Sequence, residues 1–200
     1  MRSDKAEILF ATGNSHKFRE AKAVLAKSGV RIRMLQTPKV EIQHTRLKAI
    51  AVFAAKSLSR RRDRVIMVED SGLFVENLNG FPGPYSSFVF QTIGCEGILR
   101  LMQGNSNREA NFKSVVATLL PNGDCKAFKG RVQGSISKRA AGTQGFGFDP
   151  IFVPSGRSAT FAQIDEESKN KLSHRARALE HFVKWYVDWI DAGDTGLAEP

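Results

Sequence analysis

The chain opens with an apolar run that breaks into a tight polar turn and then into a helical pattern. The run is Ile8–Ala11, the turn is Thr12–Lys17, and the following apolar residues recur at helical spacing up to Gly29. A strand that feeds a helix through a Gly-Asn turn points unpaired N–H groups and the positive end of the helix dipole at one place. Lys17 adds a full charge there. The segment departs from the G-x-x-x-x-G-K-S/T phosphate loop, so two interpretations stay open: a phosphate cradle, or a capped turn without a ligand.

Strand and helix patterns alternate along the rest of the chain. This alternation predicts an α/β fold with a mixed central β-sheet flanked by helices. We expect strands at 30–35, 65–68 and 146–153, a hairpin of 110–120 with 125–132 across the turn 121–124, and helices at 45–59 and from near Ser173.

Length and composition predict one domain over residues 1–190, followed by a polar, frayed tail over 191–200. Only Cys95 and Cys125 are present, and no signal-peptide pattern or long apolar stretch is seen, so we expect a reduced, cytoplasmic protein without a membrane partner. Lys and Arg outnumber Asp and Glu by 30 to 20. This excess predicts an anionic partner, such as a nucleotide, a nucleic acid or an acidic lipid, without choosing among them.

Two acidic residues, in the segment Glu69–Gly72, come directly after a short buried strand of this layout. Ligands of open α/β sheets gather beyond the carboxyl ends of strands, and adjacent side chains of an extended segment point in opposite directions. Glu69 and Asp70 therefore need not do the same work. Glu41, on the polar face of the alternating segment 39–43, is a candidate second oxygen ligand for Mg²⁺, which takes few carboxylates. The alternative, a loop acid that caps a helix or pairs with an arginine, stays open.

Aromatic residues alternate with glycines in the segment Gly145–Phe152. Glycine lets a flat ring approach the backbone, so a base could stack on Phe146 or Phe148. The alternative is a core strand with a glycine bulge. Asp149 before Pro150 fits either interpretation.

A cationic cluster lies at the expected start of the last helix. Positive side chains at a helix N-terminus oppose its dipole, so the cluster calls for an offsetting anion such as phosphate. A solvated basic face is the alternative. The cluster consists of Lys169, Lys171, His174 and Arg175.

Four segments in this order resemble the inosine triphosphate pyrophosphatase family: T-G-N-S-H-K, V-E-D-S-G-L with F-P-G-P-Y, G-F-G-F-D-P-I-F, and S-H-R-A-R-A-L. The resemblance spans most of the chain. It implies a Mg²⁺-dependent homodimeric hydrolase, with two lobes and an active-site cleft between them. Such an enzyme cleaves noncanonical purine nucleoside triphosphates (ITP, dITP and XTP) to the monophosphate and pyrophosphate.

The resemblance also implies roles for particular residues. Glu41 and Asp70 bind the metal, Asp70 is also the proton acceptor, and Lys17 assists catalysis as a cation on the phosphates. His174 and Arg175 read the purine edge. The full set of expected substrate contacts is Thr12, Gly13, Asn14, Ser15, His16, Lys17, Ser71, Phe146, Gly147, Phe148, Asp149, Lys169, His174 and Arg175.

Three matters stay open at this level. Many relatives carry a substrate-contacting lysine midway along the second helix, where this chain has Val52 or Phe53, and either Lys48 or Lys56 is its candidate replacement. The sequence does not show whether Glu69 joins the metal, or how guanine is rejected. Two other functions remain: a pyrophosphatase for another modified nucleotide, and a basic nucleic-acid-binding protein. We expect no stable nucleic-acid partner.

Overall fold

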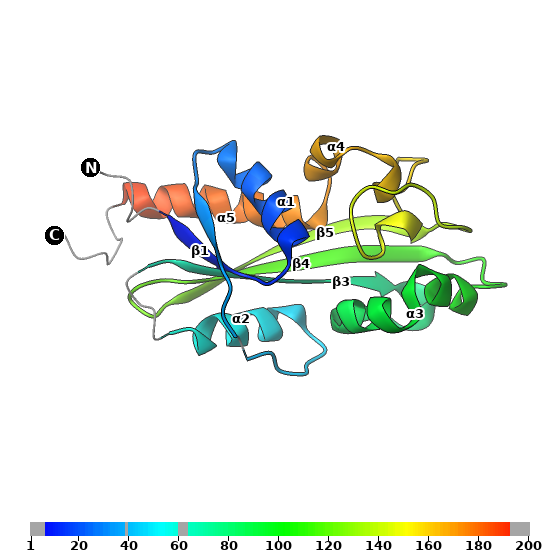
Figure 1. Cartoon of the computed structure of the whole chain (residues 1–200), viewed down its shortest axis with the longest axis horizontal. Helices are drawn as coiled ribbons and strands as arrows, with labels where there is room; N and C mark the ends of the chain where they lie inside the picture. Colours follow the sequence, from blue (N-terminus) through cyan, green and yellow to red (C-terminus); the bar gives the residue numbers. More distant parts are fainter. Residues whose placement is uncertain (1–6, 39, 60–63, 193–200) are drawn as a thin grey trace.

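The computed structural model describes residues 7–38, 40–59 and 64–192. Six strands form one sheet in the order β2-β1-β3-β4-β5-β6 (Figure 1). The strands are β1 (Ile8–Ala11), β2 (Ile32–Leu35), β3 (Ile66–Val75), β4 (Glu109–Leu119), β5 (Cys125–Ile136) and β6 (Phe152–Pro154). β1 runs parallel to β2 and β3, whereas β3, β4, β5 and β6 pair antiparallel. The predicted mixed sheet is therefore confirmed.

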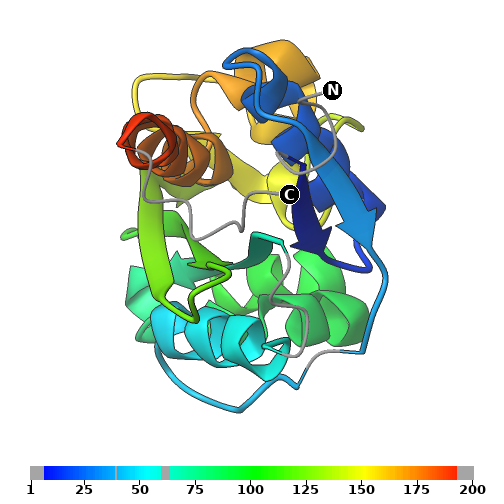
Figure 2. The ribbon, with the colours of Figure 1, turned by 90° about the vertical axis from the view of Figure 1, so that its left-hand side faces the viewer.

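Helices cover both faces of this sheet. Figures 1 and 2 show α1, α4 and α5 on one side and α2 and α3 on the other. None of the described helices is long and apolar enough to cross a membrane. Their bounds are α1 (Ser15–Ala26), α2 (Leu47–Ser57), α3 (Ser86–Leu101), α4 (Glu166–Asn170) and α5 (His174–Asp191), with short 3-10 turns η1 (Glu76–Leu78), η2 (Gly83–Tyr85), η3 (Asp149–Ile151) and η4 (Phe161–Gln163).

Local sequence signals explain where the two helices beside the site begin. Asn14 caps α1, since its side chain accepts a hydrogen bond from the Lys17 N–H. Ser173 caps α5 in the same way, through the Ala176 N–H. The predicted start of the last helix near Ser173 is thus confirmed. Residues at the starts of both helices line the same cleft as the polar segment in the middle of β3.

The apolar core lies on both faces of the sheet. Between the sheet and α1 and α5, buried residues such as Phe10, Met67 and Phe182 pack together. On the other face, α2 packs its small residues on β3 and β4. Burial at this density holds the long antiparallel strands in place, so polar groups on them are positioned by a rigid scaffold.

Two sequence predictions about strands are wrong in their bounds. The strand predicted at 65–68 continues to Val75, so Glu69–Gly72 lies inside β3 and not after it. The strand predicted at 146–153 is mostly turn and 3-10 helix, because Gly145 and Gly147 have positive φ angles of 73° and 61° that end an extended run. Only residues 152–154 are extended there.

Other expectations have mixed outcomes. The hairpin is confirmed, with its second strand continuing to Ile136. The cationic cluster is divided, because Lys169 lies on α4 and Lys171 follows it, while only His174 and Arg175 belong to α5. The two-lobed arrangement and the single domain over 1–190 stay predictions. Most of the expected tail, residues 193–200, lies outside the described residues.

Candidate active site

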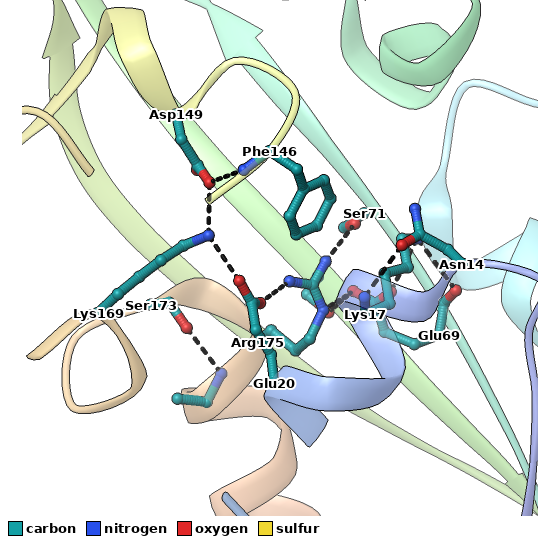
Figure 3. Close-up of polar contacts among 12 residues, drawn as sticks. Asn14, Lys17, Glu20, Glu69, Ser71, Phe146, Asp149, Lys169, Ser173 and Arg175 are labelled. Atoms are coloured by element: carbon teal, nitrogen blue, oxygen red, sulfur yellow. Dashed lines mark hydrogen bonds and ion pairs between the residues drawn. The ribbon is translucent and has the colours of Figure 1, made fainter. Parts of the chain in front are cut away.

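A cleft of about 580 Å³ opens where the turn after β1, the middle of β3, the start of α3 and the loop before η3 meet α4 and α5. It brings together residues that are far apart in the sequence (Figure 3). One predicted site residue is not among those that line it: Ser15, which is exposed at the start of α1. The predicted site residues that do line the cleft are Thr12, Gly13, Asn14, His16, Lys17, Glu41, Asp70, Ser71, Phe146, Gly147, Phe148, Asp149, Lys169, His174 and Arg175.

The turn after β1 is both capped and open to the cleft. The Thr12 Oγ1 accepts from the Asn14 N–H at 3.1 Å, and the Asn14 Oδ1 accepts from the Lys17 N–H at 3.1 Å. A Cβ added at Gly13 would meet nothing within 4 Å. The two interpretations of this turn are thus compatible: its cap sets the backbone, and its outer side borders a space large enough for phosphates.

Glu69 is a buried anion between two cations. Its Oε2 lies 2.8 Å from Lys17 Nζ, its Oε1 lies 3.2 Å from Arg175 Nε, and Ser114 Oγ donates to Oε1 at 2.6 Å. Burial opposes the charged form, but Arg175 and then Lys17 outweigh it and hold the pKa of Glu69 far below its usual range. Each oxygen thus faces one of the two cations, and Glu69 holds Lys17 and Arg175 in position at the cleft.

Arg175 is held from three sides although it is almost fully buried. Besides Glu69, its Nη1 pairs with Glu20 Oε2, and its Nη2 donates to Ser71 Oγ at 3.2 Å (Figure 3). Burial works against the guanidinium charge, yet Glu69 and Glu20 raise the pKa of Arg175 above its usual value. A guanidinium has five N–H groups, so the contacts named here leave N–H groups for a ligand in the cleft.

Lys169 joins the same network from α4. Its ammonium lies 2.6 Å from Glu20 Oε1 and 2.6 Å from Asp149 Oδ2, and 4.9 Å from the centroid of the Phe146 ring. Asp149 Oδ2 also accepts from the Phe146 N–H at 2.8 Å, which fixes the loop that carries the ring. Burial raises the pKa of Asp149, and Lys169 counteracts that shift. The aromatic loop is therefore tied to α4 and α1 by charge.

Aromatic and imidazole rings form part of the cleft wall. His16 stacks on Phe146 with ring centroids 5.1 Å apart, and His174 stacks on Phe112 at 4.7 Å. Burial, then the neighbouring Arg175, holds the pKa of His174 well below its ordinary value of 6.5. His174 is therefore neutral at physiological pH, and a neutral imidazole can both donate and accept a hydrogen bond.

Glu41 and Asp70 are two further carboxylates that line the cleft, besides those of Glu69 and Asp149. Among the described residues, no three His, Cys, Asp or Glu side chains come close enough together to hold a metal ion. This donor set fits Mg²⁺ all the same, because that ion is commonly bound through one or two carboxylates with substrate phosphates and waters. It does not fit a metal that needs a complete protein cage, such as structural zinc.

The candidate replacements for the family lysine do not reach the cleft. Lys48 borders a different groove. Lys56 lies close enough to Cys125, on the α2 side of the sheet, for its charge to lower the pKa of that thiol against the larger effect of burial. Neither residue is among those that line the cleft.

Glu20 and Ser114 belong to the site but were not predicted from the sequence. Glu20 is buried on α1 among Ala21, Val24 and Leu25, on the helix face that packs inward. An acidic residue on an apolar stripe is a signal for a buried partner, and it was available in the sequence. Ser114 had no such signal, because its role depends only on the register that pairs it with Ser71 across β3 and β4.

Two curated proteins similar to this chain come from archaea. It is 47% identical over 180 residues to the dITP/XTP pyrophosphatase of Methanopyrus kandleri, which covers 90% of this chain and 96% of that protein. The dITP/XTP pyrophosphatase of Thermococcus kodakarensis is 47% identical over 178 residues, covering 89% and 96%.

Solved structures and a family model agree with this similarity. The Ham1 protein of Staphylococcus aureus superposes with a TM-score of 0.78 at 27% identity, covering 91% of this chain and 98% of that one. The nucleoside-triphosphatase / dITP/XTP pyrophosphatase of Mycobacterium abscessus superposes with a TM-score of 0.69 at 32% identity, covering 88% and 97%. Since residues 8–185 match the sequence model of the Ham1 family, the chain belongs to that family.

Proposed function

We propose that the cleft hydrolyses noncanonical purine nucleoside triphosphates (ITP, dITP and XTP) to the nucleoside monophosphate and pyrophosphate, with Mg²⁺ as cofactor. The proposal rests on one observation: three kinds of group line the same cleft. They are the cationic turn at Lys17, the carboxylates of Glu41 and Asp70, and the aromatic loop at Phe146. The names of the archaeal relatives support the same substrate class.

The phosphates would lie along the turn after β1. There the Lys17 ammonium, kept at the cleft edge by Glu69, faces phosphate oxygens together with N–H groups at the start of α1. Glu41 and Asp70 would hold Mg²⁺ against the same oxygens, and the ion supplies neutralisation of phosphoryl charge when bound. Lys17 contributes to the same electrostatic stabilisation from a fixed position.

The reaction is an attack of water on the α-phosphorus. A new P–O bond forms to the water oxygen while the bond from the α-phosphorus to the bridging oxygen breaks, and pyrophosphate leaves with that electron pair. Asp70 orients the water and accepts its proton. Glu69 is unsuited to this task because its oxygens are engaged by Lys17, Arg175 and Ser114.

The base would enter the pocket of Phe146 and Phe148 and meet Arg175 at its edge. A guanidinium only donates hydrogen bonds, so it suits the 6-oxo group of hypoxanthine or xanthine and leaves an unpaired N–H against the 6-amino group of adenine. Such a buried unpaired donor costs about 1 to 3 kcal/mol, which is the expected scale of discrimination against ATP. Ser71 supports the selection by fixing the Nη2 of Arg175.

A homodimer is part of this proposal. Six large apolar side chains are exposed along the turn before α3 and on α3 itself, one of them (Phe90) at the edge of the cleft, and exposed apolar surface can mark an interaction site. A second copy of the chain is the partner we propose for it, and light scattering after gel filtration would test the assembly. The exposed residues are Phe81, Tyr85, Phe88, Phe90, Ile93 and Leu101. We also propose a cytoplasmic site of action, where the triphosphate pool lies.

The proposal is tested by incubating the purified protein with ITP, XTP, GTP and ATP in Mg²⁺ and identifying the phosphorus products by ³¹P NMR. We expect pyrophosphate and monophosphate from ITP and XTP, with kcat/KM at least tenfold above that for ATP, the fold-change that corresponds to about 1.4 kcal/mol. A preference for modified pyrimidine triphosphates, or release of orthophosphate in place of pyrophosphate, would overturn it.

A further inference from the structure

A second groove, of about 770 Å³, lies on the α2 face of the sheet. The start of α2 and the middle of β4 and β5 line it, and none of these residues lines the active cleft. The two sites approach each other at β4: Ser114 borders this groove and also donates to the cleft residue Glu69, while the adjacent Lys113 lies over the Phe74 ring on the α2 face. Figure 1 shows α2 on the side of the sheet opposite α1 and α5.

The walls of this groove are cationic, and no acidic residue lines it. Among the described residues, none of its five cations forms an ion pair with a carboxylate. They come from two elements that face each other. The start of α2 supplies Arg46 and Lys48, and the hairpin supplies Lys113, Lys129 and Arg131.

The arrangement concentrates positive charge at a cost to the folded chain. Lys113 and Arg131 are register partners on neighbouring strands, and like charges directly opposite each other destabilise a sheet. Arg131 is fixed in place because its Nε donates to Asn111 Oδ1 at 2.7 Å. Burial and then Arg131 lower the pKa of Lys113, with Glu76 opposing the shift. α2 adds to the same sign of potential, since its first turn contains no acidic residue.

The walls favour a phosphate anion over a nucleic acid. Single strands are held by bases stacked on open aromatic rings. The ring in this groove, Phe74, is covered by the Lys113 ammonium at 4.3 Å and by the backbone at Gly83, where an added Cβ would lie 3.4 Å from the ring. Two cationic walls without an open ring suit a short chain of phosphates.

We propose that this groove binds a small polyphosphate anion of the pyrophosphate class, independently of the reaction in the active cleft. Binding there relieves the repulsion between the hairpin cations and between them and the start of α2. The inference does not depend on the activity proposed for the cleft.

The test titrates the full-length protein with inorganic pyrophosphate in EDTA while amide signals are followed by NMR. Signals of Lys113, Lys129 and Arg131 report the groove, and those of Asn14 and Lys17 report the cleft. We expect saturable shifts at the groove, and an affinity at least tenfold lower in the double variant Lys113→Gln/Arg131→Gln.

The matched control is Lys138→Gln/Arg139→Gln, which removes two cations from a different groove that also contains Glu96. We expect this control to bind pyrophosphate as the unaltered protein does, and both double variants to hydrolyse ITP at the unaltered rate. Equal weakening in both double variants, or no weakening in either, would overturn the proposal. Equal affinity for orthophosphate, or tighter binding of single-stranded RNA, would overturn the assigned ligand class.

Discussion

Replacing the buried Glu69 by glutamine should destabilise the fold far more than the same change at an exposed ion pair of the same length. The Glu69 side chain is 1% exposed, and its carboxylate meets Lys17, Arg175 and Ser114 at 2.8, 3.2 and 2.6 Å. Glutamine keeps the volume and loses the charge, which leaves two cations in the interior without this anion. Breaking a buried pair in this way costs about 3 to 5 kcal/mol, a large part of the roughly 5 to 15 kcal/mol that holds a domain folded.

The matched control is Glu167→Gln. Glu167 lies 2.8 Å from Lys171, with side chains 72% and 61% exposed, so solvent screens the pair. Urea unfolding followed by the fluorescence of Trp185 and Trp189 measures both variants. We expect a clearly lower midpoint for Glu69→Gln and an unchanged midpoint for Glu167→Gln. Equal shifts in the two variants would refute the reasoning.

The pH dependence of this difference has a definite sign. The folded-state pKa of Glu69 is depressed below the ordinary 4.5, so the unfolded chain takes up the proton first as the pH falls. The stability that Glu69 contributes is therefore complete above the ordinary carboxyl pKa and declines below it. The gap between the unaltered protein and Glu69→Gln should be constant at neutral pH and shrink in acid.

Three further predictions follow from single contacts. Gly72→Ala should lower the free energy of unfolding by about 1 to 3 kcal/mol, because its Cβ would lie 2.1 Å from the Gly83 carbonyl oxygen. In the control Gly13→Ala the added Cβ meets nothing within 4 Å, so the midpoint of urea unfolding should not change. The ring signals of His174 should not titrate near the ordinary pKa of 6.5, because burial holds the folded-state pKa well below it. His174→Asn should remove the part of the stability that is lost as pH falls below 6.5, since only the unfolded chain takes up that proton there, and titration near pH 6.5 would contradict the burial of the ring. Glu20→Gln should lower kcat/KM for ITP by about tenfold, because Lys169 and Arg175 would lose the carboxylate that holds them in position. Unaltered kinetics would show that the positions of these two cations do not matter.

Periodic local signals predicted much of the scaffold. Alternating apolar residues, turn residues and helix caps act over only a few positions. They were therefore enough to predict the strand and turn at Ile8–Lys17 and the hairpin of β4 and β5. The cap at Asn14 is an example, since its side chain bonds a residue only three positions away.

The limits of β3 could not be predicted in this way. Glu69, Asp70 and Ser71 are polar residues inside a buried strand, and they are tolerated there because cations from α1 and α5 compensate Glu69. The error at 146–153 has a different cause. Aromatic residues alternating with glycines mimic the period of a strand, while the positive φ angle of Gly147 turns the chain.

The residues of the candidate site could be predicted from the sequence, but the ion pairs and hydrogen bonds that join them could not. The sequence contains the residues of the cleft, and the resemblance to a known family collected them. It did not show that Glu20 joins Lys169 to Arg175, since Glu20 and Lys169 are 149 positions apart and only folding brings them together. Ser15, also expected in the site, is exposed and is not among the residues that line the cleft.

The claim that the cleft positions Asp70 to activate water is tested most directly by pyrophosphate release from ITP with the variant Asp70→Asn. The asparagine keeps the shape of the side chain but cannot accept the proton as a carboxylate does, and loss of a general base lowers rates by about 10² to 10⁴. We expect kcat to fall by at least about 100-fold, with the urea midpoint unchanged. Turnover of ITP near the unaltered rate by the folded variant would contradict the mechanism.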